Sequence, residues 1–456
     1  MEHNSDVYSL ANYGLKLAER SNSDLKCAEI FFGKNNYVNI EIEENSVKNS
    51  EVGDDYGTAI RVINKKGSLG FAFTNRVEKK SIEKMIRIAL KMMNAGTIDL
   101  DFKNLPNQYN KYPDVKNLYD NNLKNLEIDE SLKYIEDLIH VCSKDELAIS
   151  QSGNFLSNYT KTHIFNSNGL FITGKETSCS ISSNIIVKDK VSNETSFGYD
   201  WQSERMLKNI SARNVAINAL EKAKRNLNRI KIKSMKTTLM LTPFGTINLI
   251  LNPIALAINA ESFQYKRSFL IDKRGEIIGP NYLNIEDNAL IDGATGSTSF
   301  DGEGVPCKNK KIFERGKFLK TGLLHNSYTA GKDNIESTGN ASRNSYSSIP
   351  SIGTSNFLLK PGDLSKDEII NEIKEGILLD YTGDSPNIST GDFSGLILHG
   401  NLIKNGEIKE PLNETMFGIN LLDLFKNIEA VSKEFKIYGS FQAPYVKVGN
   451  FRVIGG

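Results

Sequence analysis

The chain has 456 residues, of which 39% are hydrophobic and 24% are charged, a balance typical of a soluble globular protein. A chain of this length is expected to form two or three domains. The formal net charge is +1, so the surface has no general attraction for phosphate backbones. Direct nucleic-acid binding is therefore not expected.

The cysteines are scattered and form no C-x-x-C pair; they are Cys27, Cys142, Cys179 and Cys307. This spacing argues against a zinc ribbon or a dense disulfide framework, and reduced cytoplasmic thiols are expected. The opening residues lack a basic segment followed by an apolar one, so no secretory signal is expected. No apolar run reaches membrane-spanning length. We therefore expect a cytoplasmic protein without a membrane partner.

Apolar residues spaced three and four apart predict helices in the first half of the chain, over residues 7–18, 82–93, 132–142 and 212–223. Gly96 is placed to end the second of them. A basic stretch, Lys222 to Lys236, follows the last. It is either a patch for nucleic acid or an acidic partner, or a solvated helix end and linker. The linker is favoured, because no aromatic residues are interleaved for base stacking.

Alternating apolar and polar residues predict a strand over residues 38–42 and a hairpin over 58–75 that turns at 65–67. A meander of short strands is expected over 148–201, with a turn at 168–169. A buried strand is expected over 237–243. After residue 264 the sequence is mostly strand-like, with glycine turns at 274–275, 315–316 and 405–406. Two helices are expected there. One begins at Ser365, with Glu368 completing a capping box, and the other spans 420–433.

Strands and helices do not alternate strictly, so the predicted fold class is α+β. We expect an N-terminal α/β domain over 1–232, with antiparallel strands and amphipathic helices. A strand-rich C-terminal domain with a few helices is expected over 233–456. The basic stretch marks the boundary between them.

The segment "NLILNPIALAINAESF", residues 248–263, is expected to be one buried helix. Its middle carries Asn252, Pro253 and Ala257, where a chemically active helix would carry acids or imidazoles. The chain also contains no H-E-x-x-H, G-x-S-x-G or Walker motif. The histidines are dispersed. His325 and His399 are expected to be structural, although they remain possible ligands if the fold brings them together.

The segment "FDGEGVP", residues 300–306, has a closely specified backbone. Gly302 and Gly304 allow positive φ and Pro306 restricts the exit from the turn. Asp301 and Glu303 are candidates for holding a cation or a peptide amine. The alternative is a surface turn in which Asp301 caps local N–H groups, and it is favoured by about two to one because short motifs often occur by chance.

The segment "STGNASR", residues 337–343, is the second candidate. Its small residues, including Gly339, allow a backbone to come close. Arg343 offers a bidentate group for a carboxylate, and Asn340 lies between the two. The alternative is a turn with a solvent-facing arginine.

These segments occur in one order with others, among them "ERGKFLKTGLLHNSYTAGK", "STGDFSG" and "GINLLDLFKNIEAV". Together they resemble the TldD/PmbA family over essentially all of residues 236–456, and more weakly over the first half. In that family, TldD-type members carry His-Glu-x-x-x-His on a helix, and its histidines bind zinc with a cysteine near the C-terminus. The TldE/PmbA-type members lack these groups and act as partner subunits of a peptidase that takes small or unfolded peptides into a cavity.

The segment over residues 248–263 corresponds to that helix, and it has neither His nor Glu at the required places. The last cysteine is Cys307, so the C-terminus supplies no thiolate. The resemblance therefore implies a TldE/PmbA-like subunit with no catalytic residue and no metal or other cofactor of its own. Zinc is expected in a TldD-type partner.

The resemblance also implies which residues shape a peptide-binding cavity. The polar candidates are Asp301, Glu303, Asn340 and Arg343, and the turn residues are Gly302, Gly304, Pro306 and Gly339. Two alternatives stay open. One is a stand-alone homodimer that binds peptides or a protein as a regulator. The other is an enzyme that uses Asp301 and Glu303 at a different site.

Overall fold

The computed structural model describes residues 4–456. Its first sheet is antiparallel, with the strand order β3-β2-β1-β4-β5-β6. The strands are β1 (Leu25–Glu43), β2 (Ser46–Asn64), β3 (Leu69–Thr74), β4 (Ala148–Asn166), β5 (Phe171–Lys188) and β6 (Thr195–Glu204). The expectation of short strands over 148–201 is wrong, since β4 and β5 run for 19 and 18 residues. Their polar residues lie on one face and do not interrupt the backbone pairing.

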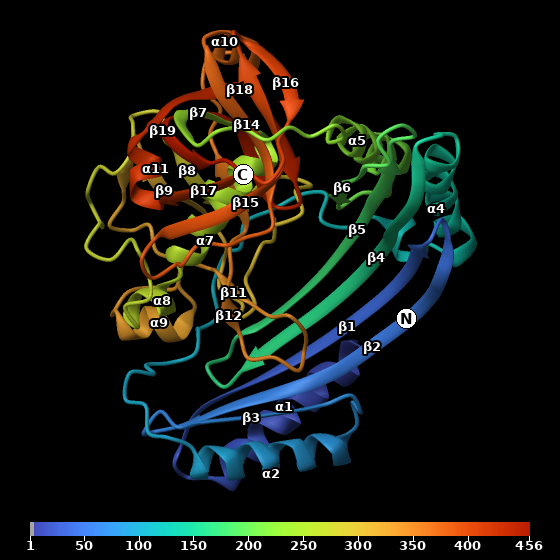
Figure 1. Ribbon diagram of the computed structural model, residues 1–456. Coiled ribbons are helices and arrows are strands. Elements are labelled where there is room, and N and C mark those ends of the chain that lie inside the picture. The colour runs from blue at the N-terminus through green and yellow to red at the C-terminus, as the bar shows by residue number, and fades with distance from the viewer. Residues whose placement is uncertain (1–3) are drawn as a thin grey trace.

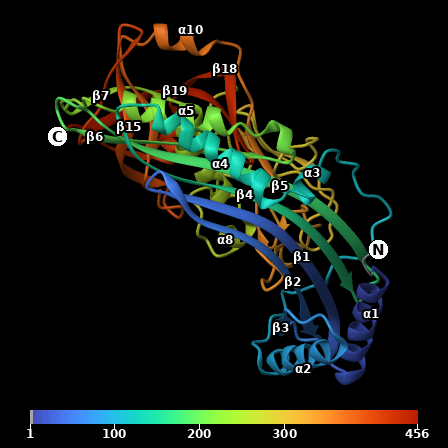
Figure 2. The same cartoon turned by 90° about the vertical axis from the view of Figure 1, so that its right-hand side faces the viewer.

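Helices cover one face of this sheet at its two ends (Figures 1 and 2). They are α1 (Asn4–Ser21) and α2 (Lys79–Ala95) at one end, and α3 (Asn121–Lys124), α4 (Ile128–Ser143) and α5 (Ala212–Arg225) at the other. The helices predicted from apolar spacing are confirmed. Even-numbered residues of β1 face the helices: Ile30 and Phe32 pack with α1 and α2, while Val38 and Ile40 pack with α4 and α5.

The second sheet is mixed and forms the C-terminal part of the fold. Its strands are β7 (Met235–Leu241), β8 (Ile285–Asn288), β9 (Asn309–Glu314), β10 (Lys317–Phe318), β13 (Asn356–Leu359), β14 (Glu375–Thr382), β15 (Asp392–Lys404), β16 (Glu407–Pro411), β17 (Met416–Asn420), β18 (Ile428–Tyr438) and β19 (Phe441–Ile454). A small separate hairpin joins β11 (Ala341–Ser342) to β12 (Ser351–Ile352). The predicted glycine turns at 315–316 and 405–406 join β9 to β10 and β15 to β16, and the predicted α+β fold class is confirmed.

The expected single helix over 248–263 is broken. The segment consists of α6 (Pro243–Thr246), a π-helical turn (Ile247–Leu251), α7 (Asn252–Ala257) and α8 (Ala260–Gln264). Pro253 cannot donate the N–H of an α-helical turn and its ring crowds the preceding carbonyls, so the helix widens before it. The Asn259 side chain then accepts from the N–H of Glu261 and starts α8 as a separate helix.

The other helices of the C-terminal domain are α9 (Ser327–Lys332), α10 (Lys366–Asn371) and α11 (Leu421–Lys426). The capping box of Ser365 and Glu368 is confirmed at the start of α10. The helix expected over 420–433 ends at Lys426, and Ile428 begins β18, which pairs with β19. Pairing with a strand later in the chain decides this segment, because its apolar spacing suits either structure.

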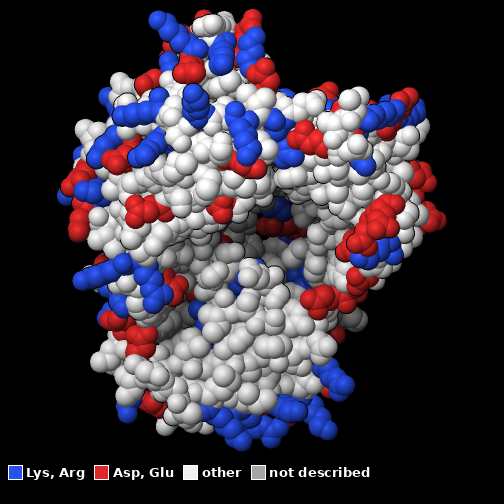
Figure 3. Space-filling model, in the orientation of Figure 1, with Lys and Arg blue, Asp and Glu red and all other residues white. Residues whose placement is uncertain are grey.

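The two sheets enclose a hollow. The first sheet curves beneath the C-terminal domain in Figure 1, and Figure 3 shows the surface hollowed between them, with acidic and basic side chains at its floor. Within residues 4–456, no helix combines the length and the apolar character needed to cross a membrane.

Candidate functional site: a cavity between the two sheets

The two motif loops, residues 300–306 and 337–343, meet in the structure. The N–H of Gly302 donates to the carbonyl of Ala341 at 2.7 Å, and the N–H of Ala341 donates to Asp301 at 2.9 Å. Two segments that sequence analysis singled out separately therefore form one wall. This wall lies against the face of the first sheet that is opposite its helices.

Asp301 shapes its own turn. Its carboxylate accepts from the backbone N–H groups of Glu303 at 2.9 Å and Val305 at 3.0 Å, in addition to Ala341. The residue is 5% exposed, so this is a buried turn and not the surface turn of the alternative. Burial, together with the nearby Glu303 charge, raises the pKa of Asp301 to about 7, although the three N–H groups oppose the rise.

The glycines of the first loop differ in conformation. Gly304 has a φ of +82°, as the sequence predicted, whereas Gly302 does not lie among the residues with positive φ. Gly302 instead sits close to the facing loop, where an added Cβ would come within 3.1 Å of the Ala341 carbonyl oxygen. Pro306 bridges back to Phe300 and closes the turn.

A buried chain of ion pairs links this wall to the first sheet. Arg61 on β2 contacts Glu303 at 2.8 Å and Glu29 on β1 at 3.0 Å. Glu29 also pairs with Arg343. Glu303 accepts from the N–H of Ser327 at 2.7 Å and from its hydroxyl at 2.6 Å. Glu303 of the first loop and Arg343 of the second are thus neutralised by residues of this chain.

Ion pairing favours the charged forms of Glu303 and Arg61 although both side chains are buried. Burial alone would raise the pKa of Glu303, but Arg61 and Ser327 hold it below its ordinary value. Burial alone would lower the pKa of Arg61, and Glu29 and Glu303 raise it instead. For Arg343, burial has the larger effect and lowers the pKa, although Glu29 opposes it.

Sequence analysis missed Glu29 and Arg61. A signal was present, since Glu29 stands in the apolar run "CAEIFF" and Arg61 in "AIRVI". A single charge in a buried strand requires a partner, because an unpaired buried charge is very costly. The sequence does not identify that partner.

Asn340 is turned away from the loop contact. Its side-chain amide donates to Asp287 and to the carbonyl of Gly353, both at 2.8 Å. Asp287 also pairs with Lys310 at 3.0 Å. Gly339, just before it, has a φ of +73°, which explains a glycine at this turn. Asn340 therefore supports the loop from behind.

The wall closes one side of a cavity of about 260 Å³. Thr160, Thr162 and Glu176 line it from the first sheet, and Thr298, Asp301 and Arg343 line it from the C-terminal domain. Of the four polar candidates, Asp301 and Arg343 reach this cavity. Its lining combines threonine and serine hydroxyls with the apolar side chains of Phe31 and Phe300, and Arg205 pairs with Glu176 at its edge.

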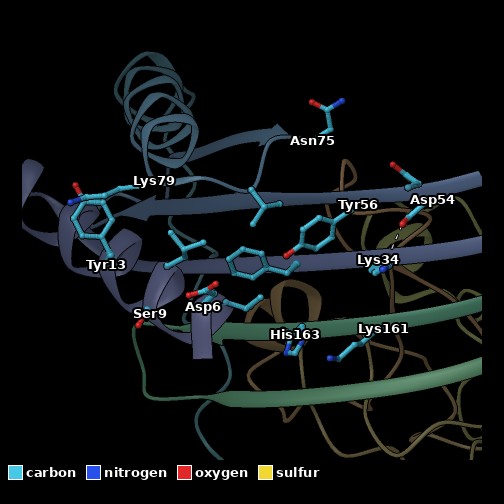
Figure 4. Close-up of a pocket in the computed structure, with 15 residues that line it drawn as sticks. Asp6, Ser9, Tyr13, Lys34, Asp54, Tyr56, Asn75, Lys79, Lys161 and His163 are labelled. Atoms are coloured by element: carbon cyan, nitrogen blue, oxygen red, sulfur yellow. Dashed lines mark ion pairs between the residues drawn. The ribbon is translucent and has the colours of Figure 1, made fainter. Parts of the chain in front are cut away.

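A larger pocket, of about 940 Å³, lies on the helical face of the first sheet (Figure 4). Tyr13 of α1 lines it, together with Lys34 and Asp54, which pair with each other at 3.6 Å. Lys79 stacks over the Tyr13 ring at 4.5 Å. The lining holds three acidic and three basic side chains, so the pocket offers no clear preference for an anion or a cation.

Buried histidines predict an acid-sensitive fold. His163 and His399 are each 7% exposed, and burial lowers the pKa of each to about 4. Unfolding restores a pKa of about 6.5, so stability is complete above that pH and falls as the pH drops towards 4.

The variant His399→Gln should be less sensitive to acid than the wild-type chain. Between pH 7 and 4 its free energy of unfolding should fall by on the order of 2 kcal/mol less, which melting temperatures measured across this pH range would show. The exposed His140→Gln should keep the wild-type pH slope, and an unchanged slope in His399→Gln would contradict the assignment.

Family models match most of the chain. The PmbA/TldA metallopeptidase domain 1 matches residues 28–93, the central domain matches 121–227, and the C-terminal domain matches 234–455. The chain belongs to the PmbA/TldD family. The expected resemblance is thereby confirmed.

Individual relatives align with most of the length of this PmbA/TldD-family protein. A metalloprotease of Methanocaldococcus jannaschii is 29% identical, covering 90% of this chain and 89% of that protein. A metalloprotease PmbA homolog of Buchnera aphidicola is 27% identical, covering 97% and 95%. The crystal structure of TldE from Thermococcus kodakarensis has a TM-score of 0.87 at 23% identity, covering 99% of this chain and 100% of that one, and so shares the fold.

The resemblance relates residues 248–263 to the zinc helix of the family, and these residues do not fit zinc in this member. Their polar side chains are the amides of Asn248, Asn252 and Asn259, the hydroxyl of Ser262 and the single, exposed carboxylate of Glu261, and β19 contains no cysteine. Zinc sites in proteins use thiolates, imidazoles and carboxylates. Across the described part of the chain, no three His, Cys, Asp or Glu side chains are grouped to hold a metal. No catalytic step through zinc follows from these residues.

Proposed function

We propose that this chain is a non-catalytic, TldE/PmbA-like partner subunit of a TldD-type zinc metallopeptidase that acts on small or unfolded peptides. The observation that carries the proposal is the amide and apolar composition of residues 248–259, where a zinc peptidase of the family needs imidazoles and a carboxylate. Without zinc, bound water stays near its bulk pKa and no hydroxide nucleophile forms. The names of the relatives, including PmbA homologs, support the branch.

The role of the motif loops in this proposal is to build the wall of a peptide cavity. Asp301 and Arg343 contribute polar surface to it, while Glu303 and Asn340 hold the loops in place from within the protein. The alternative of an enzyme based on Asp301 and Glu303 is less favoured. Their oxygens are already engaged by N–H groups, Arg61 and Ser327, so a substrate would have to displace these partners.

Mixing experiments test the proposal. The chain alone is expected to hold no stoichiometric zinc and to cleave no peptide. Peptidase activity should appear only when a TldD-type protein from the same source is added, with co-elution of a complex that buries more than ~1,200 Å². Elemental analysis, size-exclusion chromatography and cleavage of a fluorogenic peptide are the measurements.

The control for this experiment is a TldD-type partner in which the glutamate of His-Glu-x-x-x-His is replaced by glutamine. That mixture should assemble and remain inactive, which assigns the chemistry to the partner. A zinc-loaded, peptide-cleaving preparation of this chain alone would overturn the proposal. A partner that is fully active alone, and unchanged in rate and elution by this chain, would favour the stand-alone regulator instead.

A further inference from the structure

The face of the first sheet opposite its helices carries a row of uncharged polar side chains, with Tyr37 and Leu156 among them. Cross-strand register places Asn35 beside Thr160, Asn39 and Ser180 on either side of Leu156, and Asn154 beside Ser182. The alternate residues of the same strands, such as Val38 and Ile181, are buried under the helices. We call this row the polar strip; it consists of Asn35, Asn39, Asn154, Asn158, Ser180 and Ser182.

The polar strip is continuous with the interdomain cavity. Thr160 lines that cavity and its hydroxyl donates to Asn35, the first residue of the strip, at 3.1 Å. At the far end, Asn39, Asn154 and Ser182 line a shallow groove of about 510 Å³. From residue 160 to residue 152 along β4 this amounts to roughly 25 Å of extended chain.

The strip offers both donors and acceptors that are only partly used within the protein. Asn35 donates to Asn158 at 3.2 Å, and Ser182 donates to Asn154 at 2.7 Å. Beside them, the side-chain oxygen of Asn184 is buried with no hydrogen-bond partner.

The chemistry of the strip points to one class of ligand. Charged groups lie at its ends: Glu176 is paired with Arg205 at 2.9 Å, and Glu41 accepts from Asn39 at 3.1 Å. An ionic ligand would therefore meet no free counter-charge along the middle of the strip. An extended peptide backbone presents alternating N–H and C=O groups at strand spacing, which amides and hydroxyls on alternate residues can match.

We infer that the polar strip binds an extended peptide of low charge through its main chain and leads it to the interdomain cavity. This inference rests on the proposed function, because it names the surface of this subunit that holds the peptide. Recognition of main-chain groups would make binding tolerant of peptide sequence, while added charge on the strip would create a preference that the wild-type chain lacks.

The test changes charge without changing shape. In Asn154→Asp/Asn158→Asp the acceptor oxygens of both strip hydrogen bonds are kept, so the fold should be retained. Fluorescein-labelled ten-residue peptides of Gly, Ala and Ser, with and without two lysines, are titrated into the full-length chain and followed by anisotropy. The variant should bind the lysine peptide at least roughly fivefold tighter than the wild-type chain does, with a gain that shrinks as salt rises.

The matched control is Asn309→Asp, at an exposed asparagine on β9, which should leave both affinities unchanged. The two peptides are also compared by their KM values for cleavage by the complex reconstituted with a TldD-type partner.

The inference is overturned if neither measurement shows a charge-dependent change, or if the wild-type chain binds neither peptide in either assay. If the variant changes the elution volume of the chain but not its preference between the peptides, the strip is an interface between copies of the chain and the inference is overturned. An inactive mixture would refute the proposed function, while the titration of the chain alone still decides the strip.

Discussion

Replacing Arg61 by methionine is expected to destabilise the folded chain by ~3–5 kcal/mol, because it leaves Glu303 buried without a cation and leaves Glu29 with Arg343 alone. The side chains of Glu29 and Glu303 are 1% and 0% exposed, and Arg61 contacts both within 3.0 Å. Methionine fills most of the volume of the aliphatic stem, so the loss reports the charge and not a cavity. The measurement is urea unfolding followed by intrinsic fluorescence, together with the melting temperature.

Two further variants separate charge from packing. Arg76→Met removes an exposed arginine from the same domain and should stay within ~0.5 kcal/mol of wild type. Adding Glu303→Gln to Arg61→Met should recover part of the loss, since Glu29 keeps Arg343 as its partner and no buried carboxylate is then left without a cation. An Arg61→Met chain as stable as Arg76→Met would show that water or neighbouring dipoles solvate these carboxylates.

Replacing Gly304 by valine is the second change with a large expected effect. Gly304 has a φ of +82°, a conformation that costs a β-branched residue ~1–3 kcal/mol. A Cβ there would also lie 2.9 Å from Leu170 and 3.3 Å from Ile172, so both side chains must move. We expect a total loss of more than ~3 kcal/mol in thermal and urea unfolding, with the added cost coming from overpacking.

Gly169→Val provides the matched comparison. Gly169 has nearly the same φ, +84°, but an added Cβ there meets no atom within 4 Å. Its loss should therefore equal the backbone strain alone, ~1–3 kcal/mol. If Gly304→Val costs no more than Gly169→Val, then the contact between the loop and the first sheet yields easily, and the wall of the cavity is not rigid.

The relation between the motif loops and their surroundings shows where sequence reasoning ends. The sequence identified both loops, the positive φ of Gly304 and the ability of Asp301 to cap local N–H groups. These are properties of a few adjacent residues. That Glu303 pairs with Arg61, 242 positions away, depends on which face of the first sheet packs against the C-terminal domain. No local pattern contains that information.

The sequence by itself determined the elements whose causes are local. Apolar residues three and four apart specified α1, α2, α4 and α5, and turn residues specified the hairpins. Tertiary structure alone decided the length of β4 and β5 and the change from helix to strand after Lys426. Backbone pairing and packing with distant segments outweigh weak local preferences in these places, and the same long-range packing unites the ion pairs and leaves one face of the first sheet polar.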